Sequence, residues 1–233
     1  IPEHIGLGSG TQLALATATA LQKILNTNAT IPQLATTMGR AQRTGVGTAI
    51  FQNGGFVVDA GKNPETNSFP TLIFQQPFPE NWRFVVAIPN VHKGLAKDQE
   101  KKAFQQLTPM SAEAVGKICR LIVMKLLPAI AENEIEIFGE ALTQIQETVG
   151  DNFAKAQGGR YASTAAADTI NFLKTQGAYG TGQSSWGPAV YGLFKKEQTA
   201  TAQQNVKAFL EENVGGKAFT AKPNNTGAEI KLT

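Results

Sequence analysis

Three short stretches of the chain hold residues that could bind an anion or an aromatic ring. The first is the stretch 6–10, Gly-Leu-Gly-Ser-Gly, followed by Thr11 and Gln12 at the predicted start of a helix. Glycines let a backbone approach an anion closely, and the unpaired amides of a helix N-terminus point toward it. Such a short pattern also occurs in ordinary tight turns, so it predicts a phosphate site and a plain turn about equally well. The candidate phosphate-binding residues are Gly6, Gly8, Ser9, Gly10, Thr11 and Gln12.

The second stretch carries two arginines in a predicted loop, at positions 40 and 43. Its sequence, Gly-Arg-Ala-Gln-Arg-Thr-Gly-Val-Gly over 39–47, is bounded by glycines. A guanidinium group binds a carboxylate or phosphate through paired hydrogen bonds. Two solvated surface arginines are the alternative, and the surrounding glycines favour an anion clamp made by Arg40 and Arg43.

The third stretch, 182–187, combines an amide, two hydroxyls and an indole in a predicted loop before a short helix that would run through Tyr191. The candidate residues for an aromatic substrate are Gln183, Ser184, Ser185 and Trp186. An indole can pack against an aromatic ring while its neighbours donate hydrogen bonds, although a tryptophan more often serves the core.

The remaining reactive side chains predict no further site. His4 and His92 are too far apart in sequence to show metal-ligand spacing. Cys119 falls on an apolar helix face, which favours core packing. Asp59 ends a predicted strand, where capping a turn is the simplest role.

Periodicity and turn residues predict an α+β fold that positions these stretches. Helices are expected over 11–25, 32–38, 97–107, 111–130, 132–155, 164–175 and 199–212. Strands are expected over 48–52 and 55–60, joined as a hairpin by Asn53-Gly54, and over 82–89, 217–222 and 228–232. The stretch 62–80 is expected to be a loop and a domain boundary, which divides the chain into 1–76 and 77–233.

Composition narrows the class of protein. The 233 residues are 42% hydrophobic and 17% charged, with a formal net charge of +3. These values exclude a disordered polyelectrolyte and do not favour a nucleic-acid track. One cysteine excludes a disulfide framework, and no apolar run approaches the ~18 residues of a membrane span. We expect a cytoplasmic protein without nucleic-acid or membrane partners. The chain begins with Ile1 and enters a helix without a preceding strand, so we also expect a missing N-terminal portion.

Five stretches, in one order, resemble the GHMP kinase superfamily and, within it, the β-ribofuranosylaminobenzene 5′-phosphate synthase family. They are 6–16, 40–47, 54–59, 77–86 and 182–188. The resemblance implies an N-terminal α+β domain followed by a ferredoxin-like C-terminal domain. It also implies phosphoribosyl transfer from 5-phosphoribosyl pyrophosphate to 4-aminobenzoate or 4-hydroxybenzoate, with loss of CO2 and pyrophosphate, in methanopterin-type cofactor synthesis. Mg²⁺ and a homodimer are implied as well.

The chain departs from the kinase pattern of this superfamily at two places. Gly10 stands where kinases usually carry a second serine, and residues 183–186 replace a run of small glycines. Both changes disfavour ATP as substrate. An ATP-dependent small-molecule kinase and a non-catalytic ligand-binding or assembly module remain the alternatives.

Overall fold

A computed structural model describes residues 2–63, 65–66, 68–91 and 107–231, which form two compact units. Unit 1 consists of Ile1–Leu7 and Pro79–Lys222, and unit 2 of Gly8–Phe78 and Pro223–Thr233. Each unit therefore contains one end of the chain. The division into domains at residues 76 and 77 stays a prediction.

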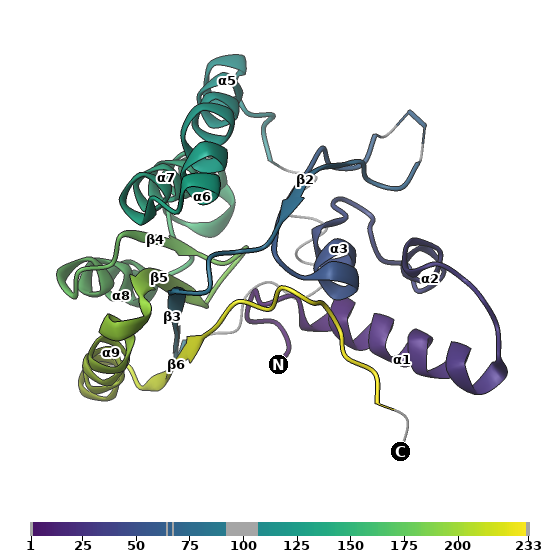
Figure 1. Cartoon of the computed structure of the whole chain (residues 1–233). Coiled ribbons are helices and arrows are strands. Elements are labelled where there is room, and N and C mark those ends of the chain that lie inside the picture. Colours follow the sequence, from purple (N-terminus) through teal and green to yellow (C-terminus); the bar gives the residue numbers. More distant parts are fainter. Residues whose placement is uncertain (1, 64, 67, 92–106, 232–233) are drawn as a thin grey trace. The chain divides into compact units, whose positions relative to one another are not determined.

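A four-stranded antiparallel sheet organises unit 1. Its strands are β3 (Trp82–Pro89), β4 (Gly180–Gln183), β5 (Val190–Lys195) and β6 (Gly216–Ala221), in the order β4-β5-β3-β6. Helices connect β3 to β4, and α9 (Thr199–Asn213), which follows the short 3₁₀ turn Lys196–Gln198, connects β5 to β6 (Figure 1). This order and connectivity are those of a ferredoxin-like split βαβ fold. The predicted α+β class is confirmed.

One hydrophobic core cluster of unit 1 lies on one face of this sheet, and Trp82 packs on Phe138 of α7 (Ile135–Gln157) on the other. Alternation along β3 points Val85 and Ala87 to the first face, where Val190 and Phe194 of β5 join them. Two helices, α8 (Thr164–Thr175) and α9, cover them with fully or nearly fully buried apolar side chains. Their apolar positions recur with helical spacing, which is why the sequence predicts both helices nearly to the residue.

A long helical segment precedes β4. It comprises α5 (Ala112–Leu121), a π-helical turn (Ile122–Leu126), α6 (Leu127–Glu132) and α7 (Ile135–Gln157). The Ser111 hydroxyl accepts a hydrogen bond from the Ala114 amide at 3.2 Å, so the predicted N-cap is confirmed. The expectation for Cys119 is wrong, because its side chain is exposed. His92 and most of the predicted helix 97–107 lie outside the described residues.

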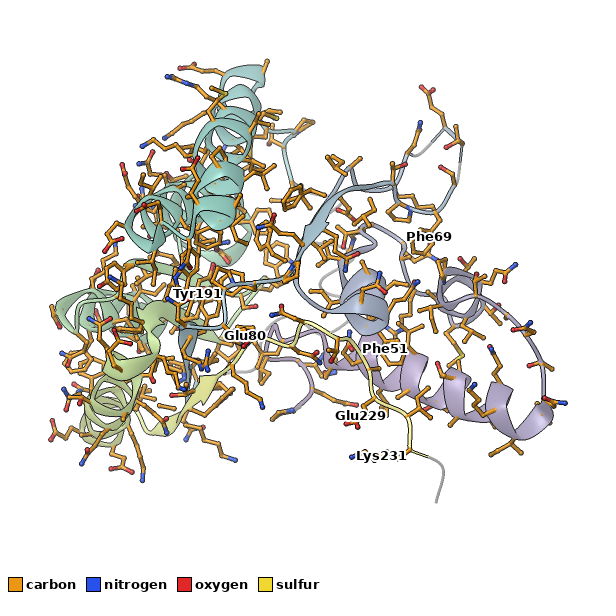
Figure 2. The ribbon with its side chains drawn as sticks, in the orientation of Figure 1. Phe51, Phe69, Glu80, Tyr191, Glu229 and Lys231 are labelled. Atoms are coloured by element: carbon orange, nitrogen blue, oxygen red, sulfur yellow. The ribbon has the colours of Figure 1, made fainter. Side chains whose placement is uncertain are left out.

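Unit 2 has three helices and a two-stranded sheet among its described residues. The elements are α1 (Ser9–Leu25), α2 (Ile31–Thr37), α3 (Val46–Asn53), β1 (Phe56–Asp59) and β2 (Leu72–Gln76). Leu15, Ala35 and Phe51 form its core, with Phe69 packed against them (Figure 2). The large apolar residues that predict α1 are the exposed ones: Leu13, Leu21, Ile24 and Leu25 are 51–78% exposed. The buried face consists of smaller residues and Leu15, which permit close helix packing.

The predicted hairpin over 48–60 is wrong. Residues 46–53 form α3, and the Gly54 amide closes that helix by donating to the Ile50 carbonyl at 2.9 Å. Gly54 has a φ of 68°, so the Asn53-Gly54 pair does include the expected positive φ. Here this conformation ends a helix instead of forming a hairpin turn. The partner of β1 is β2, which lies within the stretch predicted to be a loop.

Two further expectations near the C-terminus are wrong. The segment through Tyr191 is strand β5, because it pairs with both β3 and β4 in the centre of the sheet. Residues 228–231 form no strand, and residue 232 lies outside the described part. The described helices include none that is long and apolar enough to cross a membrane.

Candidate functional site

The first turn of α1 presents backbone amides that the helix itself does not use. Gly8 is the N-cap, with a φ of 68°, and its carbonyl accepts from the amides of Thr11 and Gln12 at 3.1 and 3.3 Å. The first amides of a helix have no intrahelical partner, and their dipoles add to a partial positive charge. The first turn of α1 carries no acidic side chain. This end of the helix can therefore accept an anion.

The guanidinium of Arg40 lies against that first turn. A Cβ atom built at Gly10 would be 3.4 Å from Nη1, 3.5 Å from Nη2 and 3.7 Å from Cζ of Arg40. The absence of a side chain at position 10 thus leaves the guanidinium next to the helix start. Arg40 Nε is buried and has no hydrogen-bond partner among the described residues. A permanent positive charge and a helix N-terminus meet at this point of unit 2.

The rest of the arginine loop is fixed by backbone contacts. The Arg40 amide donates to the Ala35 carbonyl at 2.8 Å, and the Lys62 amide donates to the Arg43 carbonyl at 2.7 Å. The Gly45 amide donates to Oδ2 of Asp59. Arg43 is exposed, and its place in the loop follows from these bonds on either side.

The starts of α1 and α3 are packed together. Gln12 Nε2 donates to the Gly47 carbonyl at 2.9 Å. A Cβ at Gly47 would be 3.1 Å from Thr11 Cγ2, closer than most real contacts, so glycine permits this approach. The Arg40 loop, which leads into α3, is thereby held beside the first turn of α1.

In unit 1, the loop after β4 contacts the N-terminal segment. Ser184 Oγ donates to the Gly6 carbonyl at 2.8 Å, and the Ala189 amide donates to the Ile5 carbonyl at 3.3 Å. Gly6 has a φ of 84°, and a Cβ there would collide with the Ser184 carbonyl. Glycine is therefore required at position 6 for both its conformation and its space.

The polar groups predicted to face an aromatic ring are engaged within unit 1. Gln183 is 6% exposed: its Oε1 accepts from the Ala162 amide at 2.7 Å, and its Nε2 donates to the Ser185 carbonyl at 3.0 Å. Trp186 is 4% exposed and stacks on Phe153 with 4.6 Å between ring centroids. Gln183 thus holds the loop's shape, while Ser185, at a φ of 54°, is exposed.

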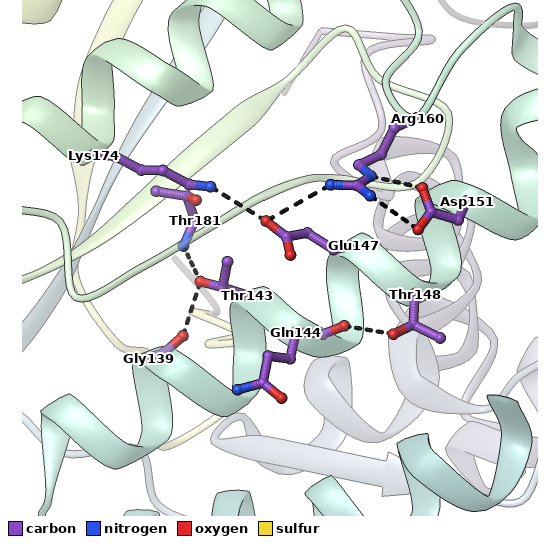
Figure 3. A network of polar contacts seen from close by, with 9 residues as sticks. All are labelled: Gly139, Thr143, Gln144, Glu147, Thr148, Asp151, Arg160, Lys174 and Thr181. Atoms are coloured by element: carbon purple, nitrogen blue, oxygen red, sulfur yellow. Dashed lines mark hydrogen bonds and ion pairs between the residues drawn. The ribbon is translucent and has the colours of Figure 1, made fainter. Parts of the chain in front are cut away.

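Behind this loop, α7 is bound to the edge strand β4. Thr143 Oγ1 donates to the Gly139 carbonyl at 2.9 Å and accepts from the Thr181 amide at 3.0 Å (Figure 3). One turn farther along α7, Glu147 forms ion pairs with Lys174 at 3.3 Å and with Arg160 at 3.9 Å. These contacts fix the strand from which the Gln183 loop leaves.

Two tyrosines near β4 have shifted acidity. Burial raises the pKa of the Tyr191 phenol strongly, and the neighbouring Tyr161 adds to the shift. Burial also raises the pKa of Tyr161, with a further contribution from Glu147. Both shifts favour the neutral phenol.

The predicted site residues thus fall into two groups. In unit 2, Gly10 meets Arg40, and Thr11 and Gln12 meet Gly47. In unit 1, Gly6 meets Ser184. The chain passes from unit 1 to unit 2 between Leu7 and Gly8, within the first glycine stretch. Sequence reasoning assigned no site role to Gly47 and Asp59, although both lie in the stretches that carry the resemblance.

The described residues contain no cluster of three or more His, Cys, Asp or Glu side chains that could hold a metal ion. The hydroxyls of Ser9 and Thr11 belong to the first turn of α1, at the candidate anion site. Magnesium in proteins is commonly held by substrate phosphates with few protein ligands. The Ser9 and Thr11 hydroxyls therefore fit an ion that a phosphorylated substrate brings with it.

Comparison with known proteins assigns both parts of the chain to one superfamily. Residues 1–55 match the GHMP kinases N terminal domain, and residues 126–212 match the GHMP kinases C terminal family. Homoserine kinase from Cytophaga hutchinsonii has a similar structure, with a TM-score of 0.72 and 19% identity over 97% of this chain and 69% of that one. Mevalonate diphosphate decarboxylase from Staphylococcus aureus is also similar, with a TM-score of 0.69 and 17% identity over 100% of this chain and 70% of that one.

Curated relatives are closer in sequence. The β-ribofuranosylphenol 5′-phosphate synthase of Methanothermobacter thermautotrophicus is 35% identical over 97% of this chain and 70% of its own length. The enzyme of the same name from Archaeoglobus fulgidus is 35% identical over 98% of this chain and 73% of its own length. The chain therefore belongs to the β-ribofuranosylphenol 5′-phosphate synthases, a family of transferases within the GHMP kinase superfamily.

Proposed function

We propose that this chain transfers a phosphoribosyl group from 5-phosphoribosyl pyrophosphate to a 4-substituted benzoate, with release of CO2 and pyrophosphate. The acceptor is 4-hydroxybenzoate or 4-aminobenzoate. The relatives are named for a ribofuranosylphenol product, which favours 4-hydroxybenzoate as the first acceptor to test. The product would serve methanopterin-type cofactor synthesis.

The observation that carries this proposal is the contact of Arg40 with Gly10 at the start of α1. The leaving pyrophosphate gains negative charge as the bond from the ribose carbon to oxygen breaks. Donors that are fixed before the reaction stabilise such charge without reorganising. The amides of Ser9 and Gly10 and the guanidinium of Arg40 supply those donors, and Arg43 from the same loop would bind a second anionic group of the donor.

The acceptor chemistry balances without a redox partner. The ring carbon that bears the carboxylate forms a bond to the ribose carbon, while the pyrophosphate leaves with the electron pair of the broken C–O bond. Loss of CO2 then returns the electron pair of the C–C bond to the ring and restores aromaticity. The para hydroxyl or amino group donates electron density to the attacking carbon, which explains why a 4-substituted acid is needed.

We assign the acceptor to the loop that Gln183 shapes in unit 1. Ser185 is exposed there, whereas Trp186 is 4% exposed and its ring face is stacked on Phe153. Gln183 and Ser184 would act by holding this loop rather than by contacting the acceptor.

Mg²⁺ would enter with the donor. Bound to pyrophosphate oxygens, it would neutralise part of the developing charge. The hydroxyls of Ser9 and Thr11 are the side chains of α1 that would hold it. Arg40 contributes a fixed positive charge at the same helix end, independent of any metal.

The proposal is tested with 5-phosphoribosyl pyrophosphate, Mg²⁺ and carboxyl-labelled 4-hydroxybenzoate, in the absence of ATP. Labelled CO2 should appear only when the donor is present, and 4-aminobenzoate is the second acceptor to supply. Arg40→Ala should suppress the release, whereas Arg120→Ala, an exposed arginine on α5, should not. Absence of donor-dependent CO2 with both acceptors would contradict the proposal. ATP consumption with a small-molecule acceptor would instead support the kinase alternative.

A further inference from the structure

We propose that Asp59 is a positioning residue that holds the loop 40–47 in the conformation that presents Arg40 and Arg43 to the anionic donor. The inference rests on the proposed function, because it assigns a purpose to the geometry of the donor site. The evidence lies within unit 2, in the contacts between the end of β1 and the start of α3.

Both oxygens of the Asp59 carboxylate accept backbone hydrogen bonds. Oδ2 accepts from the Gly45 amide, and Oδ1 accepts from the Gly61 amide at 3.3 Å. Gly45 is the N-cap of α3 and has no side chain with which to cap that helix. The carboxylate thus caps α3 from another element. A charged acceptor at a helix N-terminus is among the stronger hydrogen-bonding arrangements in proteins.

Gly45 is enclosed on this side. A Cβ at position 45 would be 3.2 Å from Phe69 Cε1, 3.4 Å from Pro70 Cβ and 3.5 Å from Asp59 Oδ2. Its φ of −93° suits any residue, so glycine is needed here for space and not for conformation. Because Gly45 is buried, removal of Asp59 would take the acceptor away from a buried amide.

This contact completes the attachment of the arginine loop. The Arg40 amide binds the Ala35 carbonyl of α2, and the Arg43 carbonyl binds the Lys62 amide. The bonds at Arg40 and Gly45 thus bracket residues 41–44, and the bond from Lys62 to Arg43 holds this segment between them. Loss of the carboxylate would remove the restraint at the Gly45 end of the segment. Ordering that segment again on binding would weaken the affinity for the anion.

The test compares Asp59→Ala, Asp59→Asn and Asp59→Glu with Asp168→Asn as the matched control. Asp168 is exposed on α8 in unit 1 and carries the same charge. Gly45→Ala perturbs the other partner of the same hydrogen bond. The readouts are the affinity for inorganic pyrophosphate by calorimetry, the KM for each substrate, and the rate of tryptic cleavage after Arg43. Cleavage of the folded protein reports local opening of this loop.

For Asp59→Ala we expect the Kd for pyrophosphate and the KM for the phosphoribosyl donor to rise about tenfold, the size expected when about one more backbone residue must be ordered on binding. The KM for the aromatic acid should stay unchanged. Asp59→Asn keeps one acceptor oxygen and should show a smaller effect, and Asp59→Glu should recover part of the affinity. Cleavage after Arg43 should accelerate in Asp59→Ala and Gly45→Ala and remain slow in Asp168→Asn.

Equal affinities for pyrophosphate in the wild type and in Asp59→Ala would overturn the inference. So would equal increases in both KM values, because a general loss of structure affects both substrates. A wild type that does not bind pyrophosphate would also overturn it, since no anion site would then need positioning. If the wild type binds pyrophosphate but releases no CO2, the proposed function fails, and the affinities and cleavage rates still decide the role of Asp59.

Discussion

The Ser184 hydroxyl donates a 2.8 Å hydrogen bond to the carbonyl of Gly6, 178 residues earlier in the chain. This bond fastens the N-terminal segment of unit 1 to the loop that follows β4. Gly6 opens the first glycine stretch, and Ser184 lies in the third stretch that the sequence singles out. Their contact means that a change in either one should disturb the other.

We expect Ser184→Ala to lower the free energy of unfolding by about 1 kcal/mol, because the Gly6 carbonyl loses a neutral donor. Gly6→Ala should cost more, since a Cβ would collide with the Ser184 carbonyl and φ is 84°. Thermal or denaturant unfolding measures both changes. Gly158→Ala is a suitable control for the positive φ alone, because no atom lies within 4 Å of a Cβ there. Equal losses of unfolding free energy in Gly6→Ala and Gly158→Ala would contradict the expected collision at position 6.

Arg40→Ala should weaken pyrophosphate binding by about tenfold to a hundredfold, the range expected for lost charge-assisted hydrogen bonds. Arg40→Lys should recover only part of the affinity, because an ammonium group lacks the planar fork of the guanidinium. Gly10→Ala should also weaken binding, since its methyl group would contact the guanidinium at about 3.4 Å. Calorimetric titration gives the Kd values, and unchanged binding in Arg40→Ala would remove this residue from the site.

Thr143→Val should destabilise the protein by about 1–3 kcal/mol. The variant leaves the Thr181 amide without its acceptor at the buried edge of β4 (Figure 3). Thr148→Val is the matched control on the same helix, because its hydroxyl bonds only to the Gln144 carbonyl one turn earlier. We expect its unfolding free energy to stay within about 0.5 kcal/mol of the wild type. Similar losses in the two variants would show that the link from α7 to β4 contributes little.

The stability should fall at alkaline pH through Tyr191. Burial raises its pKa in the folded protein above the ordinary value of about 10, so the folded state keeps the phenolic proton that the unfolded state releases. The contribution of the protonated Tyr191 to the unfolding free energy is therefore complete below pH 10. It is lost as the pH rises above 10. The difference in unfolding free energy between the wild type and Tyr191→Phe should fall by about 1.4 kcal/mol per pH unit there. If the difference in unfolding free energy between the wild type and Tyr191→Phe did not change between pH 9 and 11.5, the raised pKa of Tyr191 would be contradicted.

The sequence predicts well those elements whose local signals agree with their packing. The helix 164–175 has its predicted bounds because Ser163 caps it, with its hydroxyl accepting from the Ala166 amide at 3.1 Å, and its apolar stripe faces the sheet. The strand 82–89 is apolar except for Arg83 and pairs on both edges, with β5 and β6. In these segments, propensity, periodicity and burial indicate the same structure.

The sequence fails where tertiary contacts decide between two local possibilities. The apolar run that ends at Asn53-Gly54 fits a strand before a hairpin turn, but Asp59 and Gly47 stabilise the start of a helix there. In α1, alanines let the small face pack inward, so the large apolar residues that signal the helix remain outside. Neither choice can be seen in the residues of the segment alone.

The candidate site shows the same division. Each glycine and arginine stretch can be recognised by its residue types, because anion binding needs exposed amides and guanidinium groups. The residue types do not reveal which stretches meet. The contact of Gly10 with Arg40 and that of Gly6 with Ser184 depend on how the chain folds over long separations in sequence. The role of Asp59 appears only when its two acceptor bonds are seen.

The ratio of CO2 to pyrophosphate formed in one reaction mixture tests the central claim most directly. With 5-phosphoribosyl pyrophosphate and a 4-substituted benzoate as the only organic substrates, our account predicts one CO2 for each pyrophosphate, no need for ATP, and loss of both products in Arg40→Ala. Pyrophosphate without CO2 would indicate that the ribosyl group passes to water or to the amino or hydroxyl group instead of the ring carbon. That result, or a strict requirement for ATP, would contradict the account.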